Sequence, residues 1–172
     1  MYPKEFIEYM VHFHGDRDYF ECHEILEEYW KRIDPANKES IWVGFIQLAV
    51  ANYHHRRLNF TGAKRTLEKA GSIFKNQHET VTQLGLDYKV FMEDLTNRLA
   101  VIENKAPYSS MVLPICNPIL LNKCIDLCKR KGFDWGKPSN LTNATLVHRH
   151  KLRDRSDVIL ERDLAKNRKR QR

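Results

Sequence analysis

The segment from Ser40 to Leu58 places the strongest constraint on the fold, because it is apolar on nearly every side as far as Tyr53. A helix with one apolar stripe can lie on a protein surface, whereas a helix that is apolar all round has to be enclosed by other elements. Ser40 is a favourable N-cap residue for such a helix. The sequence therefore predicts that this segment is the central and most buried helix.

Apolar residues at helical spacing predict further helices on both sides of the central one. Gly15 and Asp16 separate the first two, and Asn117–Pro118 is an N-cap followed by proline at the first helical position. No segment shows a clear strand-type alternation, and the chain has only 7 glycines and 6 prolines, which argues against a sandwich or barrel of short strands. Besides the central helix, the predicted helices cover approximately residues 3–14, 18–33, 63–74, 87–103 and 117–132.

The predicted fold class is all-α, an antiparallel helical bundle of about five to six helices with a basic C-terminal extension. The antiparallel arrangement follows from the short connections in the first hundred residues. We expect residues 1–104 to form the bundle domain. Residues 105–172 are expected to contain a proline-containing linker, one additional helix and a basic arm, in which Ser156 or Asp157 could cap a last helix.

The positive charge is confined to that arm. The net charge is +7, but residues 1–136 hold 18 basic and 18 acidic residues, whereas residues 137–172 hold 11 basic and 4 acidic residues. One interpretation is an arm that folds onto the body and ends in a solvated tail. The other is a contact for nucleic acid or for an acidic protein surface. The candidate contact residues are Arg149, Lys151, Arg153, Arg155, Lys166, Arg168, Lys169 and Arg170.

Polar residues on two predicted helices form a candidate site. Projection at 100° per residue places His23 and Glu27 inside the apolar side of the second helix, with Glu24 at its edge. Gln47 and His54 share one stripe of the central helix, two turns apart. If the two helices are antiparallel neighbours, these side chains meet in one buried polar cluster.

Three interpretations of this cluster are open. The groups satisfy each other's hydrogen bonds and fix the helix register. Alternatively, His23, Glu27 and His54 bind a divalent metal ion. In the third interpretation Glu27 orients His23, which moves a proton for a bound substrate, as in a hydrolase. No serine or cysteine is obviously placed as a nucleophile, so the sequence favours a ligand- or metal-binding module over an enzyme.

Several classes of protein are excluded. No apolar run approaches the roughly 18 residues that a membrane span needs, and two acids in the first eight residues exclude a secretory signal. We therefore expect a cytoplasmic protein without membrane contact, whose 4 cysteines are reduced thiols. Cys124 and Cys128 are one helical turn apart and are expected to be buried rather than to bind metal.

The segment from Tyr19 to Trp30 reads Tyr-Phe-Glu-Cys-His-Glu-Ile-Leu-Glu-Glu-Tyr-Trp. It resembles the Tyr-Phe-x-x-His-Glu-x-Leu-Glu-x-x-Trp motif of the bacterial domain-of-unknown-function family 309. Matching residues continue through Gly44-Phe-Ile-Gln-Leu-Ala, Tyr53-His54 and Asn59-Phe-Thr-Gly-Ala, and the arm resembles that of its YpuF-like members. The resemblance implies a helical bundle built around these two helices, but no activity and no catalytic residues.

Overall fold

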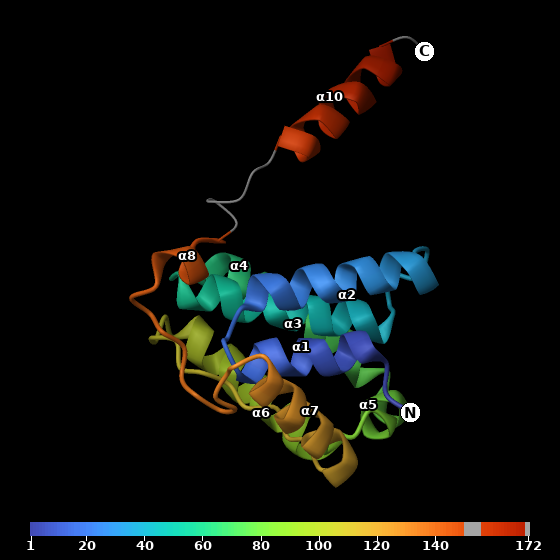
Figure 1. The fold of residues 1–172 in the computed structure, drawn as a ribbon. Coiled ribbons are helices and arrows are strands. Elements are labelled where there is room, and N and C mark those ends of the chain that lie inside the picture. Colours follow the sequence, from blue (N-terminus) through green and yellow to red (C-terminus); the bar gives the residue numbers. More distant parts are fainter. Residues whose placement is uncertain (150–155, 171–172) are drawn as a thin grey trace.

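The computed structural model describes residues 1–149 and 156–170, and the regular elements of this part of the chain are all helices (Figure 1). One isolated β-bridge joins Leu86 to Ile115. The all-α class is therefore confirmed. The helices are α1 (Lys4–His14), α2 (Tyr19–Ile33), α3 (Ile41–Arg56), α4 (Phe60–Lys75), α5 (His78–Gln83), α6 (Tyr88–Glu103), α7 (Pro118–Arg130), α8 (Ala144–Val147) and α10 (Ser156–Arg170).

Polar side chains cap the start of most of the long helices. The side chain of Asp18 accepts a hydrogen bond from the backbone N–H of Glu21, and Asn59 accepts one from Gly62. Ser40 and Asp87 cap α3 and α6, and Asn117 caps α7. These caps explain why the long helices begin close to the predicted residues. The short helices α5 and α8 exceed the predicted number, because six and four residues cannot carry a recognisable helical period.

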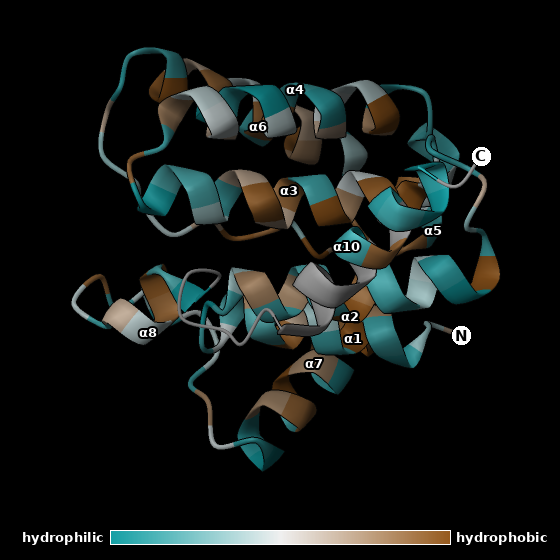
Figure 2. Ribbon diagram, turned by 90° about the horizontal axis from the view of Figure 1, so that it is seen from above, coloured by the Kyte–Doolittle hydropathy of each residue, from teal (hydrophilic) through white to brown (hydrophobic). Residues whose placement is uncertain are grey.

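Helix α3 is enclosed by other elements, as its apolar sequence requires. It packs against α2 on one side and α4 on the other, while α1 packs against α2 and α7, and α4 against α6. Figure 2 shows α3 running between α1 and α2 on one side and α4 and α6 on the other. A Cβ atom at Gly44 would lie 2.9 Å from the Phe74 ring, so the missing side chain lets α3 and α4 approach closely.

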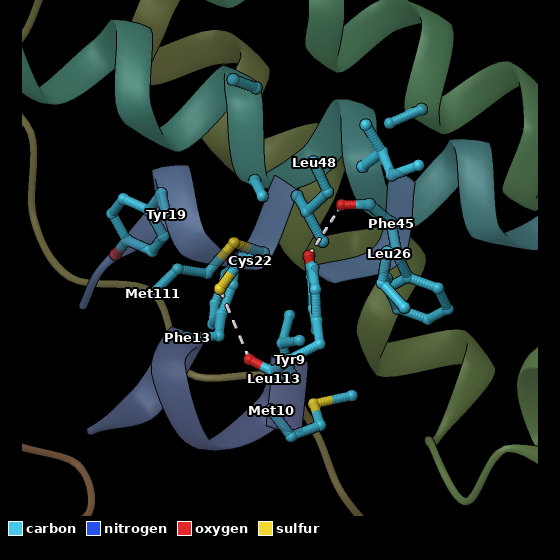
Figure 3. Close-up of a cluster of buried hydrophobic side chains, with 14 of the residues drawn as sticks. Tyr9, Met10, Phe13, Tyr19, Cys22, Leu26, Phe45, Leu48, Met111 and Leu113 are labelled. Carbon is cyan, nitrogen blue, oxygen red and sulfur yellow. Dashed lines mark hydrogen bonds between the residues drawn. The ribbon is translucent and has the colours of Figure 1, made fainter. Parts of the chain in front are cut away.

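The core includes residues from beyond the predicted bundle domain. Tyr9 donates a hydrogen bond to the carbonyl of Phe45 at 2.8 Å, within a cluster to which Met111 and Leu113 of the linker also belong (Figure 3). Cys124 and Cys128 of α7 are buried in the same core, and the four cysteines are free thiols. The linker and α7 therefore share one core with residues 1–104, and the domain boundary at residue 104 stays a prediction.

Two buried arginines hold the segment after α7 to the preceding helices. The guanidinium of Arg17, whose side chain is 1% exposed, donates to the carbonyls of Phe13 at 3.0 Å and Lys137 at 2.9 Å, and also to that of Met111. The guanidinium of Arg56 donates to the Arg17 carbonyl at 2.7 Å. It also donates to the Ser139 hydroxyl and the Leu146 carbonyl. We call residues 137–149 the strap.

No helix in the described part of the chain is long and apolar enough to cross a membrane.

The arginine contacts predict that the strap is needed for stability. A chain that ends at Gly136 removes carbonyl partners of both guanidinium groups, and we expect it to lose roughly 2–4 kcal/mol of unfolding free energy. A chain that ends at Arg149 keeps every one of these contacts and should stay within about 1 kcal/mol of the full chain. Urea denaturation of the three chains measures the difference. Equal stability of the two shortened chains would contradict the prediction.

Candidate functional site

His23 lies at the edge of the buried side of α2 and not at its centre. The buried residues of α2 are Tyr19, Cys22 and Leu26, and the last two are about 100° and 60° around the helix from His23. His23 and Glu27 are 27% and 31% exposed at their side chains. The expected burial of these side chains is therefore wrong. The half-buried rings of Phe20 and Trp30 lie on either side of His23 and extend the apolar stripe beyond the buried face.

Carboxylates occupy both ring nitrogens of His23. Its Nε2 lies 3.0 Å from a Glu27 oxygen, and its Nδ1 lies 3.3 Å from a Glu24 oxygen. The Lys31 ammonium lies 2.8 Å from the other Glu27 oxygen. Hydrogen bonds from His23 and Lys31 lower the pKa of Glu27 to about 2, with the His23 bond the largest cause. Possible metal-ligand atoms of His23, Glu24 and Glu27 lie within 4.8 Å of one another, and His54 is not part of this group.

A small pocket lies between α2 and α3, beside His23. Its volume is about 160 Å³. It brings together His23 and His54, the two histidines that the sequence predicted to converge. The ring of Phe20 lies 6.3 Å from that of Tyr53 and 6.1 Å from that of His23, measured between centroids. The lining residues are Tyr19, Phe20, His23, Val50, Tyr53, His54 and Arg57.

Asn59 fixes the protonation of His54. The Oδ1 atom of Asn59 accepts the Gly62 N–H at 3.1 Å as the N-cap of α4, so its amide nitrogen faces Nδ1 of His54 at 3.1 Å. An amide nitrogen only donates, so Nδ1 is unprotonated and Nε2 carries the hydrogen. Burial lowers the pKa of His54, and the positive charges of Arg57 and Arg65 lower it further. The neutral ring therefore offers an N–H donor at Nε2.

Gln47 is separate from this group. It lines another groove, between α3 and α4, with Val43, Lys69, Ser72 and Ile73 among its neighbours. Within the described residues no hydrogen bond joins it to His23, Glu27 or His54. Because α3 is apolar nearly all round, its sequence does not indicate which stripe faces α2. The predicted meeting of all four side chains in one cluster is therefore wrong.

The candidate contact residues of the basic arm have different surroundings. Arg149 forms ion pairs with Asp18 and with Glu21, the latter at 3.3 Å, and its guanidinium lies 5.6 Å from the centre of the Phe20 ring. This residue therefore contacts α2 beside the pocket. Lys151, Arg153 and Arg155 lie outside the described residues, and the four candidates on α10, Lys166, Arg168, Lys169 and Arg170, are exposed.

The aromatic walls of the pocket were missed from the sequence. Tyr19 and Phe20 lie in the amphipathic motif helix and Tyr53 in the apolar central helix, and aromatic residues in such helices are typical of a core. Arg57 gave a partial signal, because it ends the run His54-His55-Arg56-Arg57 at the C-terminal end of α3. The buried arginines Arg17 and Arg56 gave none, since arginine is rarely buried.

Comparison with known proteins identifies the family. A family model described as "Domain of unknown function (DUF309)" matches residues 6–66. The chain is also 50% identical over 163 residues to "Uncharacterized protein YpuF" of Bacillus subtilis (strain 168), a match that covers 95% of this chain and 94% of that protein. The chain belongs to the DUF309 family.

The DUF309 match contains every residue that lines the α2–α3 pocket. The pocket is thus formed by the part of the chain that defines the family, and the strap and α10 lie outside that part. No solved structure shows a significant match to the chain.

The pairing of Glu27 predicts a loss of stability in acid. Its pKa is about 2 in the folded protein and 4.5 in the reference state, so its contribution is complete above pH 4.5 and is lost as the pH falls towards 2. We expect Glu27→Gln to remove about 1 kcal/mol of this pH dependence, a value discounted for solvent screening. Urea denaturation at pH 7, 4 and 3 measures it. Glu28→Gln, at the exposed neighbouring position, is the control, and the same slope in both variants would contradict the prediction.

The contact between Asn59 and His54 predicts that substitution of Asn59 changes the pKa of His54. Asn59→Asp keeps an oxygen to cap α4 but places a carboxylate beside Nδ1, which stabilises the imidazolium. We expect the pKa of His54 to rise, because the new carboxylate favours the charged ring. NMR titration of the histidine Cε1–H resonances measures it. Asn59→Ser keeps the cap without the charge and should produce a smaller rise; equal pKa values in the two variants would refute the role of this contact.

Proposed function

We propose that this protein is a ligand-binding module and that its site is the pocket between α2 and α3. The observation that carries the proposal is that the family motif helix contributes Tyr19, Phe20 and His23 to a single cavity, and that the central helix contributes Tyr53 and His54. A histidine pair used only for packing would not need to line an opening of this kind. The remaining polar groups at the pocket indicate the chemistry of the ligand.

The groups around the pocket favour a ligand that carries a negatively charged hydrogen-bond acceptor. His54 offers its Nε2–H, because Asn59 occupies Nδ1. Arg57 lines the pocket, and Arg149 lies over Phe20 at one wall. The two nitrogens of His23 already face carboxylates, so this residue contributes its ring to the wall. None of the residues that line the pocket is acidic, whereas Arg57 among them is cationic.

The size of the pocket favours a single ring or a short branched chain. An apolar cavity of roughly 150 Å³ is large enough to bind benzene. At about 160 Å³ the α2–α3 pocket is similar in size. A one-ring carboxylate such as benzoate would place its ring against Phe20 and Tyr53 and its carboxylate toward His54 and Arg57. We infer that ligands of this chemical class are bound.

A divalent metal ion at His23, Glu24 and Glu27 is the second candidate. It is supported by the short distances between the three ligand atoms. It is weaker because the ammonium of Lys31 already neutralises Glu27, and because all three residues come from one helix and leave most of the coordination shell to water. A hydrolase would need this ion or His23 to activate water, and has no further support.

Binding of benzoate tests the proposal. In NMR titrations of the ¹⁵N-labelled full chain, benzoate should bind with a dissociation constant of about 1 mM or below and perturb amides of α2 and α3 around the pocket. Benzyl alcohol has the same ring without the charge and should bind at least tenfold more weakly. Zn²⁺, Mn²⁺ and Fe²⁺ are titrated in parallel, and a stoichiometric metal complex that Glu27→Gln abolishes would favour the second candidate.

Two matched variants localise the site. Val50→Phe fills the α2–α3 pocket and should abolish benzoate binding. Val43→Phe makes the same change on α3 in the separate groove and should leave binding unchanged. Melting temperatures of both variants verify that they are folded. Benzoate binding that survives Val50→Phe, or no binding to the wild-type chain, would overturn the proposal.

A further inference from the structure

A second pocket lies between α6 and the linker that follows it. Its volume is about 270 Å³, and it falls outside the residues matched by the family model. Asp94, Asn97 and Arg98 provide its polar wall from α6. The linker provides hydroxyl groups and apolar side chains. The remaining lining residues are Val101, Ser109, Ser110, Met111 and Val112.

Asp94 and Arg98 are one helical turn apart but do not form an ion pair within the described residues. An acid and an arginine at this spacing usually pair on a helix surface. Here both groups are partly withdrawn from water. Burial raises the pKa of Asp94, and the neighbouring charge of Glu93 raises it further. Burial also lowers the pKa of Arg98, which nevertheless stays positively charged at neutral pH.

The contacts of Arg98 explain why it does not form an ion pair with Asp94. The Nε2–H of His55 donates to the Ala106 carbonyl at 2.9 Å, so Nδ1 of the neutral ring is an acceptor for Nη1 of Arg98, at 3.4 Å. The guanidinium also lies 5.8 Å from the centre of the Tyr108 ring. These contacts draw Arg98 away from Asp94. Only this one hydrogen bond of the guanidinium is made within the described residues, and the other donors of Arg98 are left for a ligand.

A pocket with one carboxylate and one guanidinium held apart suits a ligand that carries both charges. A carboxylate on the ligand would accept bidentate hydrogen bonds from Arg98, and an ammonium group would donate to Asp94. The side chains of Val101, Met111 and Val112 would surround an apolar substituent. We propose that the pocket between α6 and residues 109–112 binds a free α-amino acid with an apolar side chain. This site is independent of the α2–α3 pocket.

Leucine and two analogues that each lack one charge test the proposal. In NMR titrations of the full chain, L-leucine should perturb amides of α6 and of residues 109–112. It should bind at least tenfold more tightly than 4-methylpentanoate, which lacks the ammonium, and than 3-methylbutan-1-amine, which lacks the carboxylate. Equal affinity of leucine and either analogue, or perturbations confined to other regions, would overturn the proposal.

Variants on α6 separate the role of Asp94 from a general effect of charge. Asp94→Asn should weaken leucine binding at least tenfold and leave the binding of 4-methylpentanoate unchanged. Glu93→Gln removes the adjacent charge, which does not line the pocket, and should change leucine affinity less than twofold. If both variants weaken leucine equally, the assignment of the ammonium to Asp94 is wrong. Because the benzoate experiment addresses other residues, failure of either proposal leaves the other testable.

Discussion

The buried guanidinium of Arg17 connects three parts of the chain that are distant in sequence. It lies in the turn between α1 and α2, at a backbone φ of 58°, and donates to carbonyls of α1, of the linker and of the strap. A buried charge is tolerated when hydrogen bonds replace its hydration. Three backbone carbonyl groups accept the hydrogen bonds of Arg17, and none of these acceptors is a carboxylate. The positions of the linker and the strap against α1 therefore depend on the hydrogen bonds of this one residue.

Arg56 extends the same constraint to the candidate site. It donates to the Arg17 carbonyl, and its guanidinium lies 4.6 Å from the centre of the Tyr19 ring. Tyr19 in turn forms one wall of the α2–α3 pocket. The Nε of Arg56 is buried without a hydrogen-bond partner in the described part of the chain, which makes this contact network energetically demanding. The strap thus contacts the pocket wall through Arg56, which lies against Tyr19. Its last residue, Arg149, lies over the Phe20 ring.

The sequence predicted where the helices lie in the chain better than which face of each helix is buried. Caps such as Asp18 and Ser40 and the long apolar segment of α3 are local signals, and local signals determine where a helix begins. The face that α2 buries depends on what packs against it. Half-buried Phe20 and Trp30 lie on either side of His23 and made the apolar stripe look as if it were centred there. His23 and His54 line the same pocket, whereas Gln47 lines the groove between α3 and α4, and the sequence of a helix that is apolar all round does not reveal this difference. The burial of Arg17 and Arg56 was not predictable, because most of their hydrogen-bond partners are backbone carbonyls, which every sequence contains.

A tyrosine pair separates the two pockets and determines which residues are useful for probing them. The hydroxyl groups of Tyr19 and Tyr108 are hydrogen-bonded to each other, and Tyr108 also donates to Ser110 at 3.3 Å. Tyr19 lines the first pocket and Ser110 the second. Removing the Tyr108 hydroxyl would leave the buried Tyr19 hydroxyl without this partner, and removing the Tyr19 hydroxyl would break the hydrogen bond that joins the two walls. An effect of such a variant on ligand binding would therefore not identify the pocket. Substitutions at the outer walls, at Val50 on one side and Asp94 on the other, change one pocket and leave the shared hydrogen bond in place.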